Sequence, residues 1–140
     1  MKILFDANTP GPLARFLRGH TVVRADELGW QGLENGALLN AAEQARFDLL
    51  ITCDQNVPYQ QKLTSRKLAV VILSSNHWPT LRRVAAQVAT AVDFVHTRQI
   101  VRVDVAILLG RLGSESSPVR HAEETATNQQ VRSVSGGSRD

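Results

Sequence analysis

Residues 49–56, LLITCDQN, decide the fold together with residues 3–8, ILFDAN. In each stretch a short apolar run ends abruptly in a carboxylate, Asp54 in the first and Asp6 in the second. Apolar runs without alternation are typical of strands that helices cover on both faces, as in a parallel sheet. The two stretches therefore predict two buried, parallel strands that each end in an acid.

Further strand and helix patterns alternate along the chain. The strand patterns cover 2–6, 21–25, 48–54, 68–75 and 99–105. The helical patterns cover 9–20, 37–47 and 79–96, with Thr9 expected to cap the first and Pro79 in the first turn of the third. Alternating strands and helices predict a three-layer α/β/α domain with a mostly parallel sheet of four to five strands, in the order 2-1-3-4-5.

Length and composition indicate one domain. We expect it to span residues 1–105 and to be followed by a polar tail, 106–140, that is disordered apart from one short helical turn in AILLGRLG, 106–113. Residues 1–105 hold 12 Lys and Arg against 9 Asp and Glu, so a mildly basic domain with a polyanionic partner is compatible with the sequence. No apolar run approaches the roughly 18 residues of a membrane span, and a cytoplasmic protein is expected.

Cysteine usage limits the chemistry of any metal site. Cys53 is the single cysteine of the chain, which rules out an intrachain disulfide and a cysteine-based zinc site. The histidines form no cluster in the sequence, so any metal would be held by oxygen. Cys53 itself is expected to point into the core as a small apolar residue.

The predicted sheet gives the two acids a common location. Sites in open α/β sheets form at the carboxyl ends of the strands, where the strand order reverses. If the first and third strands are neighbours, Asp6 and Asp54 stand roughly 5 Å apart at the backbone. Two carboxylates that close repel each other unless one is protonated or a cation lies between them. Hard oxygen ligands with open positions favour Mg²⁺ or Mn²⁺.

A third acid would complete a metal-binding cup. Glu34, just before the second helix, and Glu43, inside it, are the alternatives. Glu34 is preferred because helical rise carries Glu43 away from the carboxyl edge. Asp26 and Glu27 end the second strand. They are interpreted either as acids at the periphery of the metal site or as part of a solvated turn.

Three stretches resemble a small bacterial PIN-like domain, the compact branch of the PIN nuclease superfamily that is often found in toxin/antitoxin operons. They are ILFDANTP at 3–10, GHTVVRADELGWQGLENGALLNAAEQA at 19–45 and DLLITCDQN at 48–56. The shared pattern consists of an acid that ends strand one, Gly-His before strand two, Leu-Gly followed by an acid ahead of a helix, and Thr-x-Asp at the end of strand three.

The resemblance implies a metal-dependent endoribonuclease that binds Mg²⁺ or Mn²⁺ through clustered acids. Asp6, Glu34 and Asp54 fall on the acidic positions, as catalytic residues and metal ligands. Many relatives carry a second acid two residues after the Thr-x-Asp carboxylate, where this chain has Asn56. The residues expected to orient water or contact phosphate are Asn8, Asn56, Asn76, Arg82 and Arg83. The expected partners are an RNA substrate and a cognate antitoxin protein, with a homodimer as an open alternative and no membrane.

Other interpretations of the same residues stay open. Asp6 is also a suitable helix cap, and an acid at Glu34 is also favoured by the helix dipole. A non-catalytic PIN-like module that binds RNA or a partner protein fits the neutral Asn56. FDANT at 5–9 resembles the start of aspartate-nucleophile phosphatases, but its second acid is replaced by an asparagine. The basic loop of Lys62, Arg66 and Lys67 is interpreted as a solubilising segment at the far edge of the sheet.

Overall fold

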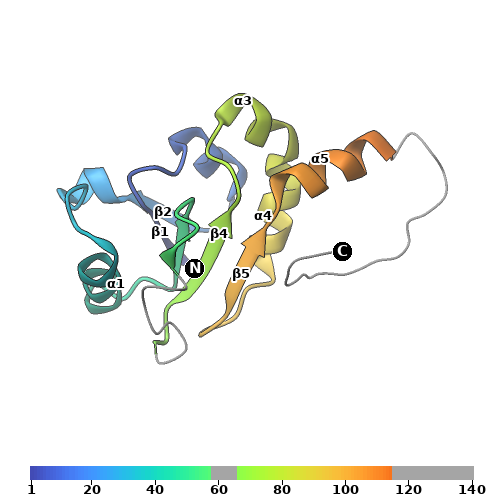
Figure 1. Cartoon of the computed structure of the whole chain (residues 1–140). Helices are drawn as coiled ribbons and strands as arrows, with labels where there is room; N and C mark the ends of the chain where they lie inside the picture. Colours follow the sequence, from blue (N-terminus) through green and yellow to red (C-terminus); the bar gives the residue numbers. More distant parts are fainter. Residues whose placement is uncertain (58–65, 115–140) are drawn as a thin grey trace.

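The computed structural model of the chain describes residues 1–57 and 66–114, and within them it forms one parallel sheet (Figure 1). The strands are β1 (Lys2–Phe5), β2 (Thr21–Arg24), β3 (Leu49–Thr52), β4 (Ala69–Leu73) and β5 (Ile100–Val103). Their order is β2-β1-β3-β4-β5, and every neighbouring pair is parallel. The predicted three-layer α/β/α class and the 2-1-3-4-5 order are confirmed.

Helical segments connect the strands and cover the sheet. The α-helices are α1 (Asn35–Gln44), α3 (Trp78–Leu81), α4 (Ala85–Asp93) and α5 (Val105–Ser114), and the 3₁₀ helices are η1 (Gly11–Phe16), η2 (Ala25–Leu28) and η4 (Arg82–Val84). No helix within residues 1–57 and 66–114 is long and apolar enough to cross a membrane.

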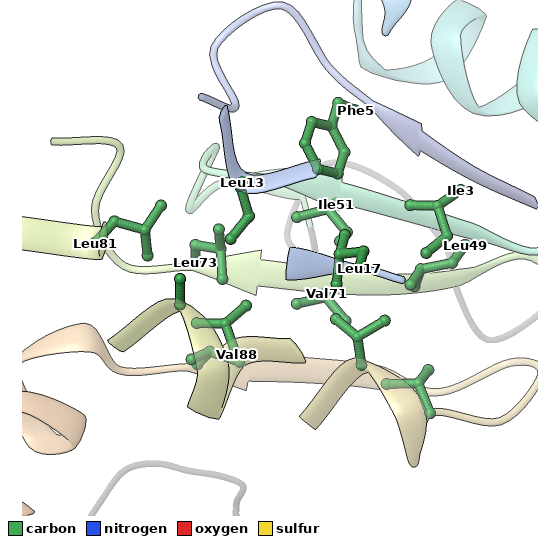
Figure 2. Packing of buried hydrophobic residues seen from close by; sticks show 14 of the residues in the cluster. Ile3, Phe5, Leu13, Leu17, Leu49, Ile51, Val71, Leu73, Leu81 and Val88 are labelled. Carbon is green, nitrogen blue, oxygen red and sulfur yellow. The ribbon is translucent and has the colours of Figure 1, made fainter. Parts of the chain in front are cut away.

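Alternate side chains of the central strands supply two separate cores. Ile3 and Phe5 of β1 join one apolar cluster, while Leu4 between them joins the other. This division follows from the period of two residues with which a strand presents its side chains. The first cluster also contains residues of η1, of α4 and of the segment α3–η4 that leads into α4. Figure 2 shows this packing. The second cluster packs under α1, which lies on the opposite side of the sheet (Figure 1).

The first crossover differs from its sequence pattern. The structure has a 3₁₀ helix of six residues where a longer helix was expected, and its N-cap is Pro10, without a capping side chain. The expectation that Thr9 caps this helix is therefore wrong. The Thr9 hydroxyl lies instead within hydrogen-bonding distance of the Asp6 carboxylate and the carbonyl oxygen of Ile51 on the neighbouring strand. A buried hydroxyl needs such partners, and the two strand ends offer them.

The long helix expected over 79–96 is broken in two. Three residues of 3₁₀ structure, η4, separate the single turn of α3 from α4. Leu81 and Val84 are three residues apart and both are fully buried. Because a 3₁₀ helix has three residues per turn, η4 places both side chains on the core face. The part of the expected helix that contains Arg82 and Arg83 is thereby reduced to the short turn η4.

The chain beyond β5 continues into a ten-residue helix, α5, which is longer than the short helical turn expected from the sequence. Leu108, Leu109 and Leu112 of α5 are partly buried and pack against the first core cluster. The folded part of the chain therefore includes residues beyond 105. The rest of the predicted tail, 115–140, lies outside the described residues.

Two residues of the basic loop before β4, Arg66 and Lys67, have a structural role that the composition of the loop does not indicate. Arg66 donates hydrogen bonds from Nη1 to Asn40 at 2.8 Å and to Glu43 at 2.6 Å, both on α1. The Lys67 backbone N–H donates to the second Glu43 oxygen at 3.2 Å. Arg66 therefore anchors α1 rather than serving only as a solubilising residue, whereas Lys62 lies outside the described residues. The Glu43 carboxylate is therefore hydrogen-bonded at the amino end of β4.

Candidate functional site

The candidate site lies where the two central strands end. Phe5 of β1 is in register with Ile51 of β3, and the backbone N–H of Asp6 donates to the Ile51 carbonyl at 3.2 Å. The crossover after β1 leads to one side of the pair and β3 lies on the other, so this edge is the point where the strand order reverses. Open α/β sheets bind ligands at such points.

Asp6 accepts hydrogen bonds from three donors, two in the loop after β1 and one at the end of β3. Its Oδ1 accepts the Asn8 backbone N–H at 3.2 Å and the Thr9 hydroxyl at 2.8 Å, and its Oδ2 accepts the Thr52 hydroxyl. The contact with Asn8 is the turn that an aspartate makes with the backbone two residues on. A carboxylate has about four acceptor positions, so one position on Oδ2 is left.

Asp54 is bound to the same cluster through Thr52. The Asp54 backbone N–H donates to the Thr52 hydroxyl oxygen at 3.0 Å, so this hydroxyl connects the two acids. Its carboxylate accepts the Asn56 backbone N–H on Oδ1 at 2.9 Å and the Asn35 amide on Oδ2 at 3.1 Å. Among the described residues, each of its oxygens therefore keeps one acceptor position.

Burial and charge act together on Asp6. Burial raises the pKa of this carboxyl above its ordinary value, hydrogen bonds from Thr52, Thr9 and Asn8 oppose that increase, and the Asp54 charge adds to it. Removing a carboxylate from water disfavours its charged form, and a second negative charge nearby has the same effect. The pKa of the neighbouring Cys53 thiol rises to about 11, chiefly through burial and then through the charge of Asp6. At neutral pH Cys53 is thus an inert thiol.

A hollow of about 340 Å³ opens beside Asp6 on the side of β2. The polar and charged residues that line it, together with one glycine, are Asp6, Asn8, Thr9, Gly11, Arg24, Asp26 and Asn76. They come from the loop after β1, the end of β2 and the loop after β4, which all meet at the carboxyl edge. Asp6 therefore faces two environments, with Asp54 across Thr52 on one side and the hollow on the other.

Glu34 lies next to this cluster but is not hydrogen-bonded into it. It is the N-cap residue of α1, its side chain makes no capping hydrogen bond, and it is exposed. Its neighbour Asn35 donates to Asp54, which brings the start of α1 close to that acid. Within residues 1–57 and 66–114 no three His, Cys, Asp or Glu side chains form a group that could hold a metal ion.

The donor set still fits one hard divalent cation. Mg²⁺ is commonly bound through one or two carboxylates together with waters and substrate phosphates, so it does not require a cage made entirely of protein. Among the described contacts Asp6 and Asp54 retain acceptor positions, and Asn8 adds a neutral side-chain oxygen at the same edge. The Asn8 side-chain oxygen accepts the Cys53 backbone N–H at 3.4 Å, which ties the two loops together.

The other residues expected at the site are spread more widely. Asn76 lines the hollow, and Asn56 is exposed after its backbone contact with Asp54. Arg82 and Arg83 are exposed on η4 and do not line the hollow. The ring of His77 is hydrogen-bonded to the Thr80 hydroxyl within the turn of α3.

Two site residues, Thr52 and Arg24, were missed by sequence reasoning. Thr52 is completely buried and connects both acids, although the Thr-x-Asp pattern had drawn attention only to its aspartate. Arg24 ends β2 and lines the hollow with Asp26. The signal for Arg24 was its position at a strand end, the same argument that identified Asp6.

Comparison of the chain with protein-family models, with curated proteins and with solved structures found no match.

Proposed function

We propose that this protein is a cytoplasmic, metal-dependent endoribonuclease of PIN-like type that acts as the toxin of a toxin/antitoxin pair. The observation that carries the proposal is the pair Asp6 and Asp54, joined through the buried Thr52 hydroxyl at the reversal point of the sheet. The sequence resemblance supports the choice of RNA, because Asp6, Glu34 and Asp54 occupy acidic positions of that pattern.

In this proposal Asp6 and Asp54 hold one Mg²⁺ or Mn²⁺ ion. The ion, when bound, lowers the pKa of a coordinated water and polarises the scissile phosphate. Thr52 and Thr9 fix the orientation of the Asp6 carboxylate, and Asn35 fixes that of Asp54. These contacts spare the carboxylates a reorganisation when substrate binds, which is the usual benefit of preorganised ligands.

Glu34 is assigned a more distant role. In this proposal its exposed side chain, at the start of α1 next to the residue that contacts Asp54, orients a water molecule. Replacing it by glutamine is therefore expected to reduce cleavage less than replacing either aspartate.

The test is cleavage of labelled single-stranded RNA with Mg²⁺ or Mn²⁺ and with EDTA. Asp6→Asn and Asp54→Asn are each expected to lower the rate about a hundredfold or more, since each removes a charged ligand. Asp48→Asn is the matched control, because Asp48 precedes β3 as Asp54 follows it and its carboxylate accepts only the Lys2 backbone N–H in the described contacts. Cleavage that persists in both site variants, or in EDTA, would contradict the assignment.

The toxin role has a test of its own. Induced expression of the wild-type chain should arrest the growth of a bacterial host, and Asp6→Asn should relieve the arrest at equal protein level. Arrest by both proteins alike would argue against a toxin that acts through this site.

A non-catalytic module that binds RNA is the second candidate. Asn56 stands where the PIN-like pattern carries an acid, and the described residues contain no group of three acids around Asp6. On this interpretation, wild-type protein binds RNA in EDTA with the same affinity as in Mg²⁺ and never cleaves it. The cleavage assay and a binding assay on the same RNA separate the two candidates.

A further inference from the structure

Arg24 is held in a fixed orientation at the wall of the hollow. Its Nε donates to Asp26 Oδ1 at 3.1 Å and its Nη2 donates to Asp26 Oδ2 at 2.9 Å. This two-point contact uses one edge of the planar guanidinium group. Asp26 stays ionised because the contact with Arg24 lowers the pKa of its carboxyl. Arg24 ends β2 and Asp26 follows it in η2, so both partners of the pair come from one short stretch of the chain.

The second edge of the guanidinium group remains available. Among the described residues, Nη1 of Arg24 has no hydrogen-bond partner, and Nη2 keeps one further N–H. Gly11 makes room for this edge, because a Cβ atom at position 11 would lie 2.7 Å from Nη1. Two parallel N–H groups thus lie beside Gly11 in the wall of the hollow. Such a pair matches a ligand with two adjacent acceptors.

The charge of the hollow decides between phosphate and a neutral ligand. One cation, Arg24, faces two acids, Asp26 and Asp6, and the other polar lining side chains are neutral, namely those of Asn8, Thr9 and Asn76. A phosphate placed here would meet more negative than positive charge. A neutral planar ring with donors and acceptors would instead find partners for both. The volume, about 340 Å³, lies at the lower end of the range of small-ligand pockets, about 300–1,000 Å³.

We propose that this hollow is a nucleobase subsite in which Arg24 reads a base that presents two adjacent acceptors. Guanine does so with O6 and N7, the pair that arginine recognises most often, and cytosine does so with N3 and O2. Adenine and uracil lack two adjacent acceptors. The inference rests on the proposed function, since it assigns the bound base to an RNA whose phosphate would lie at the cation held by Asp6 and Asp54.

The test measures binding of the four ribonucleosides, which carry no phosphate, to the full chain in EDTA. Chemical shifts of the Arg24 side-chain Nε–H and of the backbone amides around Gly11 report on the hollow during each titration. Guanosine and cytidine are expected to bind about tenfold more tightly than adenosine and uridine. Inorganic phosphate, titrated alone, is expected to leave these signals unchanged.

Three variants separate recognition from folding. Arg24→Lys keeps the charge but loses the paired donors, and it should weaken guanosine binding about tenfold or more. Gly11→Ala keeps every hydrogen-bonding group and displaces only the guanidinium end of Arg24. A similar loss of guanosine affinity is expected. Arg18→Gln is the matched control, because Arg18 is exposed and precedes β2 at the opposite edge of the sheet.

Each outcome has a definite meaning for the subsite. Equal affinities for the four nucleosides, no nucleoside binding, unchanged guanosine affinity in Arg24→Lys, or shifts caused by phosphate alone would overturn it. The nuclease proposal fails independently, because nucleoside binding in EDTA requires no cleavage. Selective guanosine binding without RNA cleavage would support the subsite and leave the protein as a binding module.

Discussion

Thr52 is the residue on which the candidate site depends most. It is fully buried at the end of β3, donates its hydroxyl proton to Asp6 and accepts the backbone N–H of Asp54. A hydroxyl can donate once and accept at the same time, and valine, its isostere, can do neither. One side chain therefore orients one acid and positions the backbone of the other.

Thr52→Val is expected to raise the pKa of Asp6 further, since the Thr52 hydrogen bond is the largest of the contacts that lower it. The variant should also lose about 1–3 kcal/mol of unfolding free energy, because two polar groups lose a buried partner. The pKa can be measured by carboxyl carbon chemical shifts in EDTA, and stability by urea unfolding. Thr90→Val on α4, whose hydroxyl bonds only to Ala86 in the described contacts, is the control.

The sign of the pH dependence follows from the direction of that shift. The pKa of Asp6 is raised in the folded state, so folded protein binds the proton more tightly than unfolded protein in the range just above the ordinary pKa. Asp6 therefore contributes a loss of stability as pH rises through that range. Thr52→Val should enlarge this loss, and an unchanged pH profile in the variant would contradict the contact.

Among the elements, α5 shows how a helix becomes part of a core through a few positions. Its leucines at 108, 109 and 112 pack against the first apolar cluster. Ile107, which directly precedes them, is 42% exposed. The spacing of these leucines follows the three-to-four residue repeat of a buried helical stripe. Packing against η4 and the first apolar cluster, rather than helix propensity alone, is what stabilises so short a helix.

Leu108→Ala is expected to lower the free energy of unfolding by about 1–3 kcal/mol, less than for a fully buried leucine because the side chain is only partly buried. Ile107→Ala, one position away and exposed, should change it by less than about 0.5 kcal/mol. Urea unfolding of the full chain measures both values. Equal, small effects of the two substitutions would mean that α5 does not contribute to the core.

For the whole molecule, the parallel sheet both stabilises the fold and creates the site. Burying the strands on two faces leaves their carboxyl ends as the place where polar side chains gather, and there Asp6, Asp54 and Arg24 meet from three different strands. Two acids held close together store electrostatic repulsion in the folded state. A cation that relieves this repulsion should therefore bind folded protein and stabilise it.

Addition of Mg²⁺ or Mn²⁺ is expected to raise the thermal midpoint of the wild-type chain. A concentration a hundredfold above the dissociation constant corresponds to about 2.7 kcal/mol of added stability. Asp54→Asn should abolish the shift, and Asp48→Asn, at the other end of β3, should retain it. An identical shift in all three proteins would indicate nonspecific ion binding. Differential scanning calorimetry in matched ionic strength provides the measurement.

The strand order 2-1-3-4-5 was predicted only as the order common in such sheets, and the tertiary structure confirms it. The sequence by itself determined the alternation of strands and helices and the placement of Asp6 and Asp54 at strand ends, because these features depend on short-range patterns of apolar residues. The tertiary structure alone decided which groups meet there. The Thr52 contact with Asp6 spans 46 positions, and the approach of Gly11 to Arg24 joins a loop to another strand. Local periodicity says nothing about such partners, since they depend on how loops close over the edge of the sheet. The break at η4 has the same origin, because packing of Leu81 and Val84 prevails over a sequence that favours one continuous helix.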